Sequence, residues 1–330
     1  MLPRALGVLS KKVDSIETLN TSLPKQHIGL FEFIRLNTKF KWRFTKKLMN
    51  KVLGGGRDDW LIIYGKNTQA NQPNLSFDTF TRISPPNDEF WADPFLFEYE
   101  GRDFLFLEIF PFARGLGHLS VIELFDDGSY SEPKTILKTD FHLSYPNVFE
   151  YKGKIYMVPE SGDNKTISLY EAEEFPYKWK LKYHLMEDVQ AYDVTFQEHN
   201  GKWYIFAAVA QSADFPTTDE LFIFHSDSPI SQNWEAHAKN PVISDVSTAR
   251  PAGQIYKEDN KLIRPSQDCA GSYGAALNFN EILVLNEHEY QEQLIEKKKP
   301  DWDPSLSALH TLNFNKKYTV SDAILAKGLK

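Results

Sequence analysis

The chain has 330 residues, of which 42% are hydrophobic and 14% aromatic, which is enough to bury a large core. Its single cysteine, Cys269, excludes an intramolecular disulfide, and no apolar run approaches the ~18 residues that a membrane-spanning helix needs. The net charge of −8 combines +9 in residues 1–57 with −17 in the remainder, and such an acidic body argues against nucleic acid as a partner.

Residues 1–57 are predicted to form a basic and largely helical N-terminal extension. The segment 26–53 reads as a helix with apolar positions among Lys and Arg, and it ends at Gly54-Gly55-Gly56. Such a helix could contact an anionic membrane surface, a partner protein or the acidic body. The N-terminus makes a poor signal peptide, so we expect a cytoplasmic protein, peripheral to the inner membrane surface if this helix binds lipid.

After the glycines, residues 60–64 read as a strand, and residues 65–88 form a polar connection. The stretch FWADPFLFEYEGRDFLFLE then gives an apolar hairpin pattern that presents Asp93, turns at Gly101 and returns to Glu108. The same pattern recurs around Gly153 and Gly201. A looser fourth copy starts at Arg250 and turns at Asp259-Asn260.

The copies start near residues 93, 145, 193 and 250, at spacings of 52, 48 and 57 residues. This is the period of a four-stranded propeller blade. One early strand and a late strand pair around residues 306–320 remain, and they predict a fifth blade that is closed by both ends of the domain. The sequence therefore predicts an all-β, five-bladed β-propeller over residues 58–330.

The polar residues of innermost strands would converge at the propeller axis, although they are distant in sequence. Asp93 lies in an aromatic strand, and Asp193 holds the same place two copies later. Two carboxylates at one site can act on a glycosidic bond, one as base or nucleophile and one as support. The structural alternative is that both aspartates cap turns or bind backbone amides.

Glu160 ends the second strand of the second copy, where it matches Glu108 in the first. We predict Glu160 as the catalytic acid, and the alternative for both glutamates is a salt bridge at the rim. Arg250 and Arg264 could clamp an anionic group, or they could form an Arg–Asp network within the fourth blade. The full set predicted to bind substrate is Trp91, Tyr145, Asn147, Tyr192, Arg250, Arg264, Gln267 and Asp268.

The sequence predicts neither a metal nor a cofactor. His142, His237 and His310 are scattered without metal-ligand spacing and are interpreted as structural residues. The glycines at 54–56 lack the Lys-Ser/Thr of a phosphate-binding loop. The absence of βαβ alternation disfavours the usual doubly wound nucleotide-sugar enzyme.

Several short segments together carry a family resemblance, namely FWADPFLFE, HLSYPNVFE, YMVPES, ARPAG, RPSQDC and HTLN. They resemble the N-terminal domain of plant glucosamine inositolphosphorylceramide transferase, a domain that also occurs in bacterial proteins, over residues 60–322. That domain is similar in turn to the five-bladed propellers of glycoside hydrolase families 43 and 32. In those families an Asp-Pro motif carries the base or nucleophile, which the resemblance places at Asp93, with Asp193 as the second aspartate.

The resemblance leaves the glutamate acid of those families without a clear counterpart, since they place it on a later blade than the one that carries Glu160. It also assigns the transferase chemistry of the plant protein to a separate C-terminal domain. We therefore expect a sugar or nucleotide-sugar ligand and glycosyl transfer in surface-glycan or glycolipid assembly. The alternatives are a glycoside hydrolase and a non-catalytic propeller that presents a glycan to partner enzymes.

Overall fold

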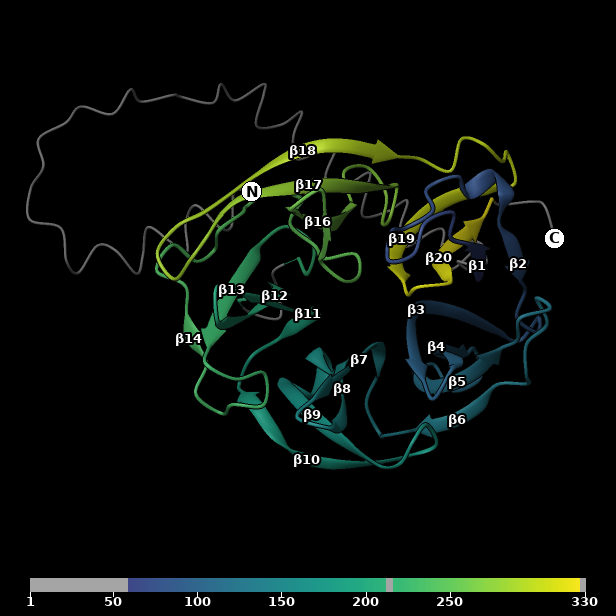
Figure 1. The fold of residues 1–330 in the computed structure, drawn as a ribbon, viewed down its shortest axis with the longest axis horizontal. Helices are drawn as coiled ribbons and strands as arrows, with labels where there is room; N and C mark the ends of the chain where they lie inside the picture. The colour runs from purple at the N-terminus through teal and green to yellow at the C-terminus, as the bar shows by residue number, and fades with distance from the viewer. Residues whose placement is uncertain (1–58, 212–215, 327–330) are drawn as a thin grey trace, which may run out of the picture. The chain divides into compact units, whose positions relative to one another are not determined.

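The computed structural model describes residues 59–211 and 216–326. Within residues 58–330, five four-stranded antiparallel sheets surround a central axis (Figure 1). The predicted five-bladed propeller is therefore confirmed. The predicted helix at 26–53 lies outside the described residues.

Blade 1 comprises β3 (Glu89–Tyr99), β4 (Arg102–Pro111), β5 (His118–Leu124) and β6 (Lys134–Leu137). Blade 2 comprises β7 (Ser144–Tyr151), β8 (Lys154–Glu160), β9 (Thr166–Glu174) and β10 (Lys178–Glu187). Blade 3 comprises β11 (Ala191–His199), β12 (Lys202–Val209), β13 (Leu221–Ser226) and β14 (Glu235–Ala236). The blades follow one another in chain order around the axis.

Blade 4 comprises β15 (Tyr256–Glu258), β16 (Lys261–Asp268), β17 (Ala276–Leu285) and β18 (Tyr290–Lys298). Blade 5 is assembled from both ends of the domain, in the order β19 (Leu306–Phe314), β20 (Tyr318–Leu325), β1 (Trp60–Lys66) and β2 (Thr81–Ile83). Strand β1 pairs with β20 from Trp60↔Ile324 to Lys66↔Tyr318. The predicted closure of the fifth blade by both ends is confirmed.

The hairpins between the first two strands of blades 1 to 4 explain the repeat that the sequence shows. In each turn both central residues have positive φ, as at Asn200 (52°) and Gly201 (78°). Such turns match the twist of an antiparallel hairpin and favour Gly or Asn. Blade 4 uses Asp259 and Asn260 in the same conformation. The turn residues therefore fix where each hairpin begins and ends.

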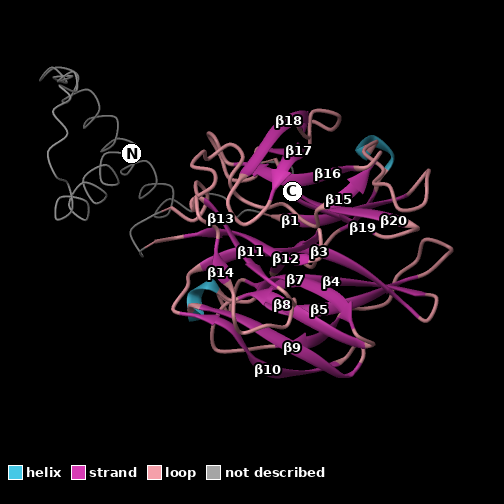
Figure 2. Ribbon diagram, turned by 60° about the vertical axis from the view of Figure 1, so that its left-hand side comes forward, coloured by secondary structure: helices cyan, strands magenta, loops and turns pink. Residues whose placement is uncertain are grey.

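Apolar residues fill the interfaces between neighbouring blades. Figure 2 shows the strands of these blades from a second direction. Between blades 1 and 2, Phe175 packs against Phe97, Phe104 and Trp179. Polar side chains, in contrast, are buried near the ends of the inner strands. In the part of the chain that the structure describes, no helix combines the length and the apolar character needed to cross a bilayer.

Candidate active site

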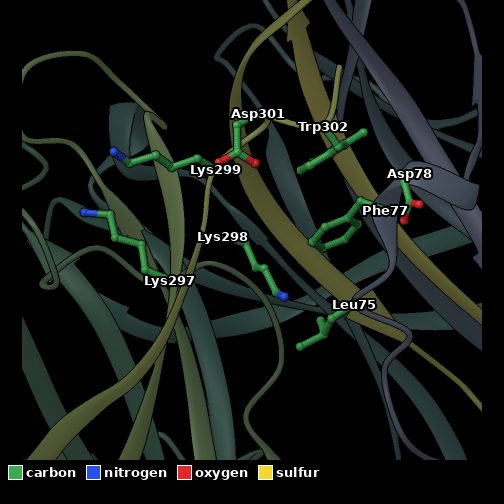
Figure 3. A pocket seen from close by; sticks show the side chains of 8 residues that line it. All are labelled: Leu75, Phe77, Asp78, Lys297, Lys298, Lys299, Asp301 and Trp302. Carbon is green, nitrogen blue, oxygen red and sulfur yellow. The ribbon is translucent and has the colours of Figure 1, made fainter. Parts of the chain in front are cut away.

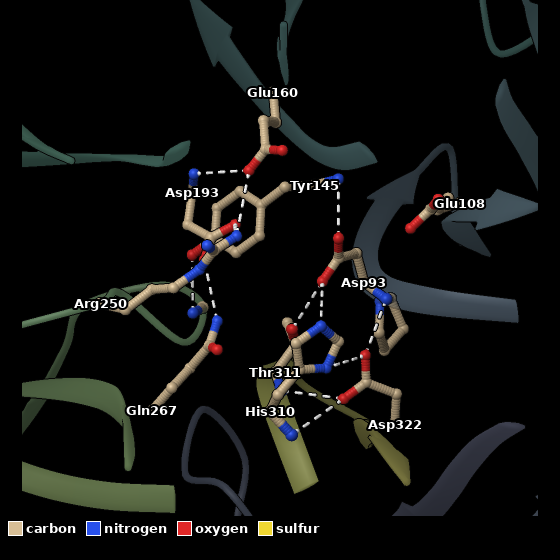
Figure 4. Close-up of polar contacts among 12 residues, drawn as sticks. Asp93, Glu108, Tyr145, Glu160, Asp193, Arg250, Gln267, His310, Thr311 and Asp322 are labelled. Carbon is tan, nitrogen blue, oxygen red and sulfur yellow. Dashed lines mark hydrogen bonds and ion pairs between the residues drawn. The ribbon is translucent and has the colours of Figure 1, made fainter. Parts of the chain in front are cut away.

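The inner strands share a β-bulge, at which the pairing with the next strand is interrupted. In β3 the pairing skips from Ala92↔Glu108 to Phe95↔Phe106, which leaves Asp93 unpaired. The same skip occurs in β7, β11 and β19. Arg250 takes the corresponding place before blade 4, because Pro251 bridges to Ser266. The five equivalent residues, hereafter the central group, are Asp93, Tyr145, Asp193, Arg250 and His310 (Figure 4).

Three residues of the central group have left-handed backbone conformations. Asp93, Tyr145 and Asp193 have φ of 51°, 46° and 52°. For residues other than glycine such conformations cost on the order of 1–3 kcal/mol each, and they persist only where the surroundings hold them. Here carboxylates hold them, because each of the three residues donates its amide to a buried acid. The acceptors are Asp322 for Asp93 (2.8 Å), Asp93 for Tyr145 (3.2 Å) and Glu160 for Asp193 (3.1 Å).

One half of the site is built around Asp93 and His310. Asp93 Oδ1 accepts a hydrogen bond from the Thr311 hydroxyl (2.8 Å) and lies 3.3 Å from His310 Nε2. His310 Nδ1 lies 2.7 Å from Asp322 Oδ2 on the neighbouring strand β20. Burial alone would lower the pKa of His310, but the Asp322 and Asp93 carboxylates outweigh it and raise this pKa above its usual value.

Ligand atoms of Asp93, His310 and Asp322 all lie within 4.8 Å of one another, close enough to surround a metal ion. The neighbours of Asp322, however, already occupy its oxygens, because Oδ1 accepts the amides of His310 (3.2 Å) and Thr311 (2.9 Å). The raised pKa of His310 also favours an imidazolium, which cannot ligate a cation. The contacts are therefore explained as an Asp–His–Asp ion-pair network.

The other half of the site is built around Asp193 and Arg250. Arg250 Nε and Nη2 donate to the two oxygens of Asp193 at 2.5 and 3.3 Å, and Nη2 lies 3.5 Å from Glu160 Oε2. Arg250 Nη1 donates to Thr217. Gln267 Nε2 adds a hydrogen bond to Asp193 Oδ2 (2.8 Å). All three guanidinium nitrogens are therefore engaged, and Asp193 is held as a paired carboxylate.

Aromatic rings enclose Arg250 on two sides. Its guanidinium carbon lies 5.5 Å from the ring centre of Tyr192 and 5.3 Å from that of Tyr273. Tyr273 belongs to the loop between β16 and β17, and its ring also lies 5.3 Å from that of His310. Tyr273 is 40% exposed, whereas Arg250 and His310 are buried. This ring therefore separates both halves of the central group from solvent.

Tyr145 crosses from blade 2 to blades 3 and 4. Its hydroxyl lies 2.7 Å from Thr195 Oγ1 and accepts the amide of Gly253 at 2.7 Å. The side chain is fully buried, and burial raises its pKa well above the usual value. Tyr145 thus ties three blades together next to Asp93.

Two strand-end glutamates lie beside the central group. Glu160 pairs with Arg250, as described above, whereas the one ion-pair partner of Glu108 among the described residues is His142, with Nε2 at 3.4 Å. Burial raises the pKa of both carboxyls well above the usual value. Asp193 raises the pKa of Glu160 further and Arg250 opposes this, while Asp93 and Glu160 raise that of Glu108 further. The two glutamates thus occupy equivalent positions in different electrostatic surroundings.

The structure brings most, but not all, of the predicted residues together. Asp93, Asp193, Glu160, Tyr145, Tyr192, Arg250 and Gln267 meet at the centre. Asn147 lies beside them and donates to the Val194 carbonyl (3.1 Å). Trp91 packs into the interface between blades 1 and 5 and donates to Glu89.

Arg264 and Asp268 belong to other clusters. Arg264 is fully buried, forms an ion pair with Glu292 (2.6 Å) and donates to the Thr248 carbonyl (2.7 Å). Asp268 pairs with Lys297. Arg250 and Arg264 therefore do not form one clamp.

Sequence reasoning missed three residues of this site. His310 was interpreted as structural, and Asp322 and Thr311 were not singled out. A signal for His310 exists, because it sits in the bulge of the last inner strand, where Asp93 sits in the first. Asp322 has no such signal, since it contacts Asp93 across 229 positions of sequence.

A surface pocket of about 340 Å³ lies apart from the central group (Figure 3). Its aromatic wall is Phe77 stacked on Trp302, with ring centres 5.2 Å apart. Lys297, Lys298 and Lys299 line it from the end of blade 4. None of its lining residues belongs to the central group.

Comparison with known proteins identifies the family. The family model described as "Glucosamine inositolphosphorylceramide transferase 1, N-terminal" matches residues 68–304. Glucosamine inositolphosphorylceramide transferase 1 of Oryza sativa subsp. japonica is 36% identical over 223 residues, which cover 67% of this chain and 30% of that protein. The Arabidopsis thaliana protein of the same name is 33% identical over 226 residues, 68% of this chain and 29% of that protein. The chain thus spans about 30% of the length of these relatives.

Solved structures support the fold. A family 117 glycoside hydrolase of the marine bacterium Zobellia galactanivorans is similar with a TM-score of 0.51 and 11% identity, over 83% of this chain and 94% of that one. The catalytic domain of a Coprinopsis cinerea family 62 α-L-arabinofuranosidase is similar with a TM-score of 0.51 and 10% identity, over 81% and 98%. At these identities the likeness concerns the fold alone. By its sequence and its propeller, the chain belongs to the family of glucosamine inositolphosphorylceramide transferase 1 N-terminal domains.

Proposed function

We propose that this propeller is a carbohydrate-active enzyme that acts on a glycosidic bond, with glycosyl transfer as its reaction. One observation carries the proposal: Asp93, Asp193 and Glu160, from three blades, meet in one buried group with Arg250 and His310. Several buried carboxylates with different partners are what glycosidic-bond chemistry uses. The relatives' name favours transfer over hydrolysis.

The contacts suggest a division of roles. Asp93 is the base or nucleophile, because its partners are a hydroxyl, an amide and an imidazole, and none of these is a permanent cation. Asp193 is the supporting carboxylate, since Arg250 forms an ion pair with it and Gln267 donates a hydrogen bond to it. One of the two strand-end glutamates, Glu160 or Glu108, supplies the proton.

Two other functions keep some support. Hydrolysis is favoured by the shared fold with glycoside hydrolases. Presentation of a bound glycan, without catalysis, is favoured by the burial of the central carboxylates, which act also as acceptors for backbone amides. The position of a bound sugar relative to Asp93 separates chemistry from presentation.

A thermal-shift screen of nucleotide sugars and oligosaccharides tests the proposal. We expect a ligand that raises the melting temperature of the wild type and raises that of Asp93→Asn much less. Asp103→Asn is the matched control, because Asp103 is an equally buried acid of blade 1 that pairs with Lys317 at 3.0 Å. The control should lose stability but keep the ligand-induced shift.

Turnover of the ligand then decides between the functions. We expect the wild type and Asp103→Asn to release or transfer the sugar. The turnover rate of Asp93→Asn should be at least 100-fold lower. Binding without turnover, equal in all three proteins, would identify a presenting propeller. The contact of residues 26–53 with a membrane or a partner, and a cytoplasmic location, stay predictions.

A further inference from the structure

Among the residues that the structure describes, no Lys or Arg forms an ion pair with the buried acid Glu108. Its side chain is only 6% exposed, and it ends strand β4 directly across from Ala92, next to Asp93. Among the described residues, its Oε1 has no hydrogen-bond partner. Figure 4 likewise shows no contact between Glu108 and the other residues drawn. A buried carboxylate oxygen with neither a cation nor a hydrogen-bond donor beside it is costly, whereas a protonated acid is not.

His142, the basic side chain that lies beside Glu108 in the described part of the chain, is held in its neutral form. His142 Nε2 lies 3.4 Å from Glu108 Oε1, and the Gly117 amide donates to His142 Nδ1 at 3.0 Å. Nδ1 must therefore keep its lone pair, so the ring carries its single proton on Nε2, facing Glu108. Burial lowers the pKa of His142, which agrees with this neutral form.

The loop geometry keeps this pair in place. A Cβ at Gly117 would lie 2.3 Å from Glu108 Oε1 and 2.8 Å from His142 Cε1, so only glycine fits between them. Arg114 holds the same loop by donating to the carbonyls of Leu116 and Gly117 at 3.2 and 3.3 Å. Glu108 and His142 are therefore fixed against each other by backbone contacts.

The charges that act most strongly on Glu108 favour its protonated form. Its acidic neighbours are Asp93, Glu160, Asp322 and Asp193. The charged groups that act on His142 are Asp163 and Asp93, which favour its charged form, and Arg114 and Arg250, which oppose it. Glu160, in contrast, has Arg250 at 3.5 Å and binds the Asp193 amide. Of the two glutamates, Glu108 is the one without a cation to stabilise its carboxylate.

We propose that Glu108 is the proton donor of this site, kept protonated because it is buried among carboxylates and His142 beside it brings no positive charge, and that the substrate is a glycoside with an alcohol leaving group. This inference rests on the proposed action on a glycosidic bond. As the bond from the anomeric carbon to the leaving oxygen breaks, its electron pair goes to that oxygen. The oxygen takes the proton of Glu108, which becomes a carboxylate. Asp93 bonds to the anomeric carbon or takes the proton of the incoming hydroxyl.

The substrate class follows from the need for a proton. An alkoxide leaves poorly unless an acid protonates it, whereas a nucleoside diphosphate leaves as a stable anion. A buried and protonated Glu108 is thus of use for a sugar–alcohol bond and of little use for a nucleotide sugar. Flat, half-buried rings lie beside it: the ring centre of His142 is 5.9 Å from that of Phe110, at a tilt, and Phe110 stacks on Phe90 (4.7 Å). They offer a surface for the leaving sugar.

Infrared spectroscopy of the full chain without ligand tests the protonation directly. At neutral pH the wild type should show the carbonyl band of a buried, protonated carboxylic acid. The band should vanish in Glu108→Gln and remain in Glu160→Gln, in which the same change is made at the equivalent strand end. A band that instead disappears in Glu160→Gln and persists in Glu108→Gln would overturn the proposal, as would the absence of any such band.

A pair of variants at His142 tests the cause. His142→Lys places a cation beside Glu108, so the band should vanish although Glu108 is present. His142→Gln keeps a neutral side chain and should keep the band. If His142→Lys keeps the band while both variants stay folded by circular dichroism, the neutral histidine is not what holds the proton.

An activity series separates this proposal from the proposed function. Aryl glycosides of the sugar found in the screen, with good and poor leaving groups, are the probes. Glu108→Gln should lose about 10²–10⁴-fold on poor leaving groups and far less on good ones, whereas Asp93→Asn should lose activity on both. Equal losses of Glu108→Gln on all probes, or turnover of nucleotide sugars alone, would overturn the proton donor. If the wild type turns over no sugar at all, the proposed function is wrong. The infrared result would still show whether Glu108 is protonated.

Discussion

At the scale of residues, His310 of the last inner strand, β19, contacts Asp93 of the first inner strand, β3. It lies between Asp93 and Asp322, and their negative charges raise its pKa despite its burial. A histidine whose pKa is higher in the folded than in the unfolded state stabilises the fold below about pH 6.5, its unfolded value. This contribution is lost as the pH rises through the raised, folded value.

The first prediction concerns this pH dependence. We expect His310→Gln to lower the free energy of unfolding most below pH 6.5, and progressively less as the pH rises through the raised pKa of His310. Urea unfolding of both proteins at several pH values measures the difference. Groups that do not contact His310 contribute equally in both proteins, so the difference reports His310 together with its two aspartate contacts. A difference that grows with pH would mean that His310 is neutral in the fold.

The sequence pointed to Asp93, Asp193 and Glu160, which lie at the centre, but it also predicted Arg264 there, and Arg264 lies elsewhere. Gln267 and Arg264 lie three positions apart on β16. Side chains alternate between the two faces of a strand, so residues three apart face opposite sides. Since Gln267 binds Asp193, Arg264 points away from it and pairs with Glu292. Polar composition alone does not reveal which of two neighbouring polar residues faces the axis.

At the scale of elements, the hairpin turns made the fold predictable. Glycine marked the positions of the hairpins in the sequence because these turns need positive φ, which Gly adopts without strain. The fifth blade lacks this marker. Its hairpin turns at Asn315 to Lys317, and its other strands come from the far end of the domain. His310 therefore escaped the alignment of copies that found Asp93, Tyr145, Asp193 and Arg250.

The second prediction tests the turn that joins β11 and β12. Gly201 has φ of 78°, and no atom lies within 4 Å of the position that a Cβ would take. Gly201→Ala should therefore destabilise the protein by about 1–2 kcal/mol, the cost of a left-handed L-residue, with no steric contribution. Chemical denaturation measures this cost. Ligand binding should be unchanged, and a large loss of binding would show that the turn is coupled to the site.

The third prediction concerns the loop between β16 and β17. Tyr273 is 40% exposed and lies over Arg250 and His310. If its ring packs on a bound sugar, Tyr273→Ala should weaken binding roughly 10-fold, the size of one aromatic contact, while Tyr273→Phe should bind normally. Calorimetry with the ligand from the screen measures both. Tighter binding in Tyr273→Ala would instead identify the ring as a cover that a ligand must displace.

At the scale of the whole propeller, β1 closes the ring of blades. Its neighbouring residues Leu61 and Ile62 face opposite sides of the strand. Leu61 packs with Ile263 and Leu277 of blade 4, and Ile62 packs with Trp91 and Leu107 of blade 1. Blade 5 is thus bound on both faces as well as through its strand pairing. Its position also carries His310 and Asp322 to Asp93, so closure and site assembly depend on the same contacts.

The fourth prediction is that blade 5 does not open on its own. Leu61→Ala and Ile62→Ala remove buried side chains from the two faces and should each cost about 2–5 kcal/mol. We expect each variant to keep one unfolding transition, because detaching blade 5 would expose the apolar residues on both faces of β1. Hydrogen exchange measures this by strand: β20 and β8, in distant blades, should lose protection by the same amount. Early exchange confined to β19, β20 and β1 in either variant would show that the blade opens locally, and the site would then open with it.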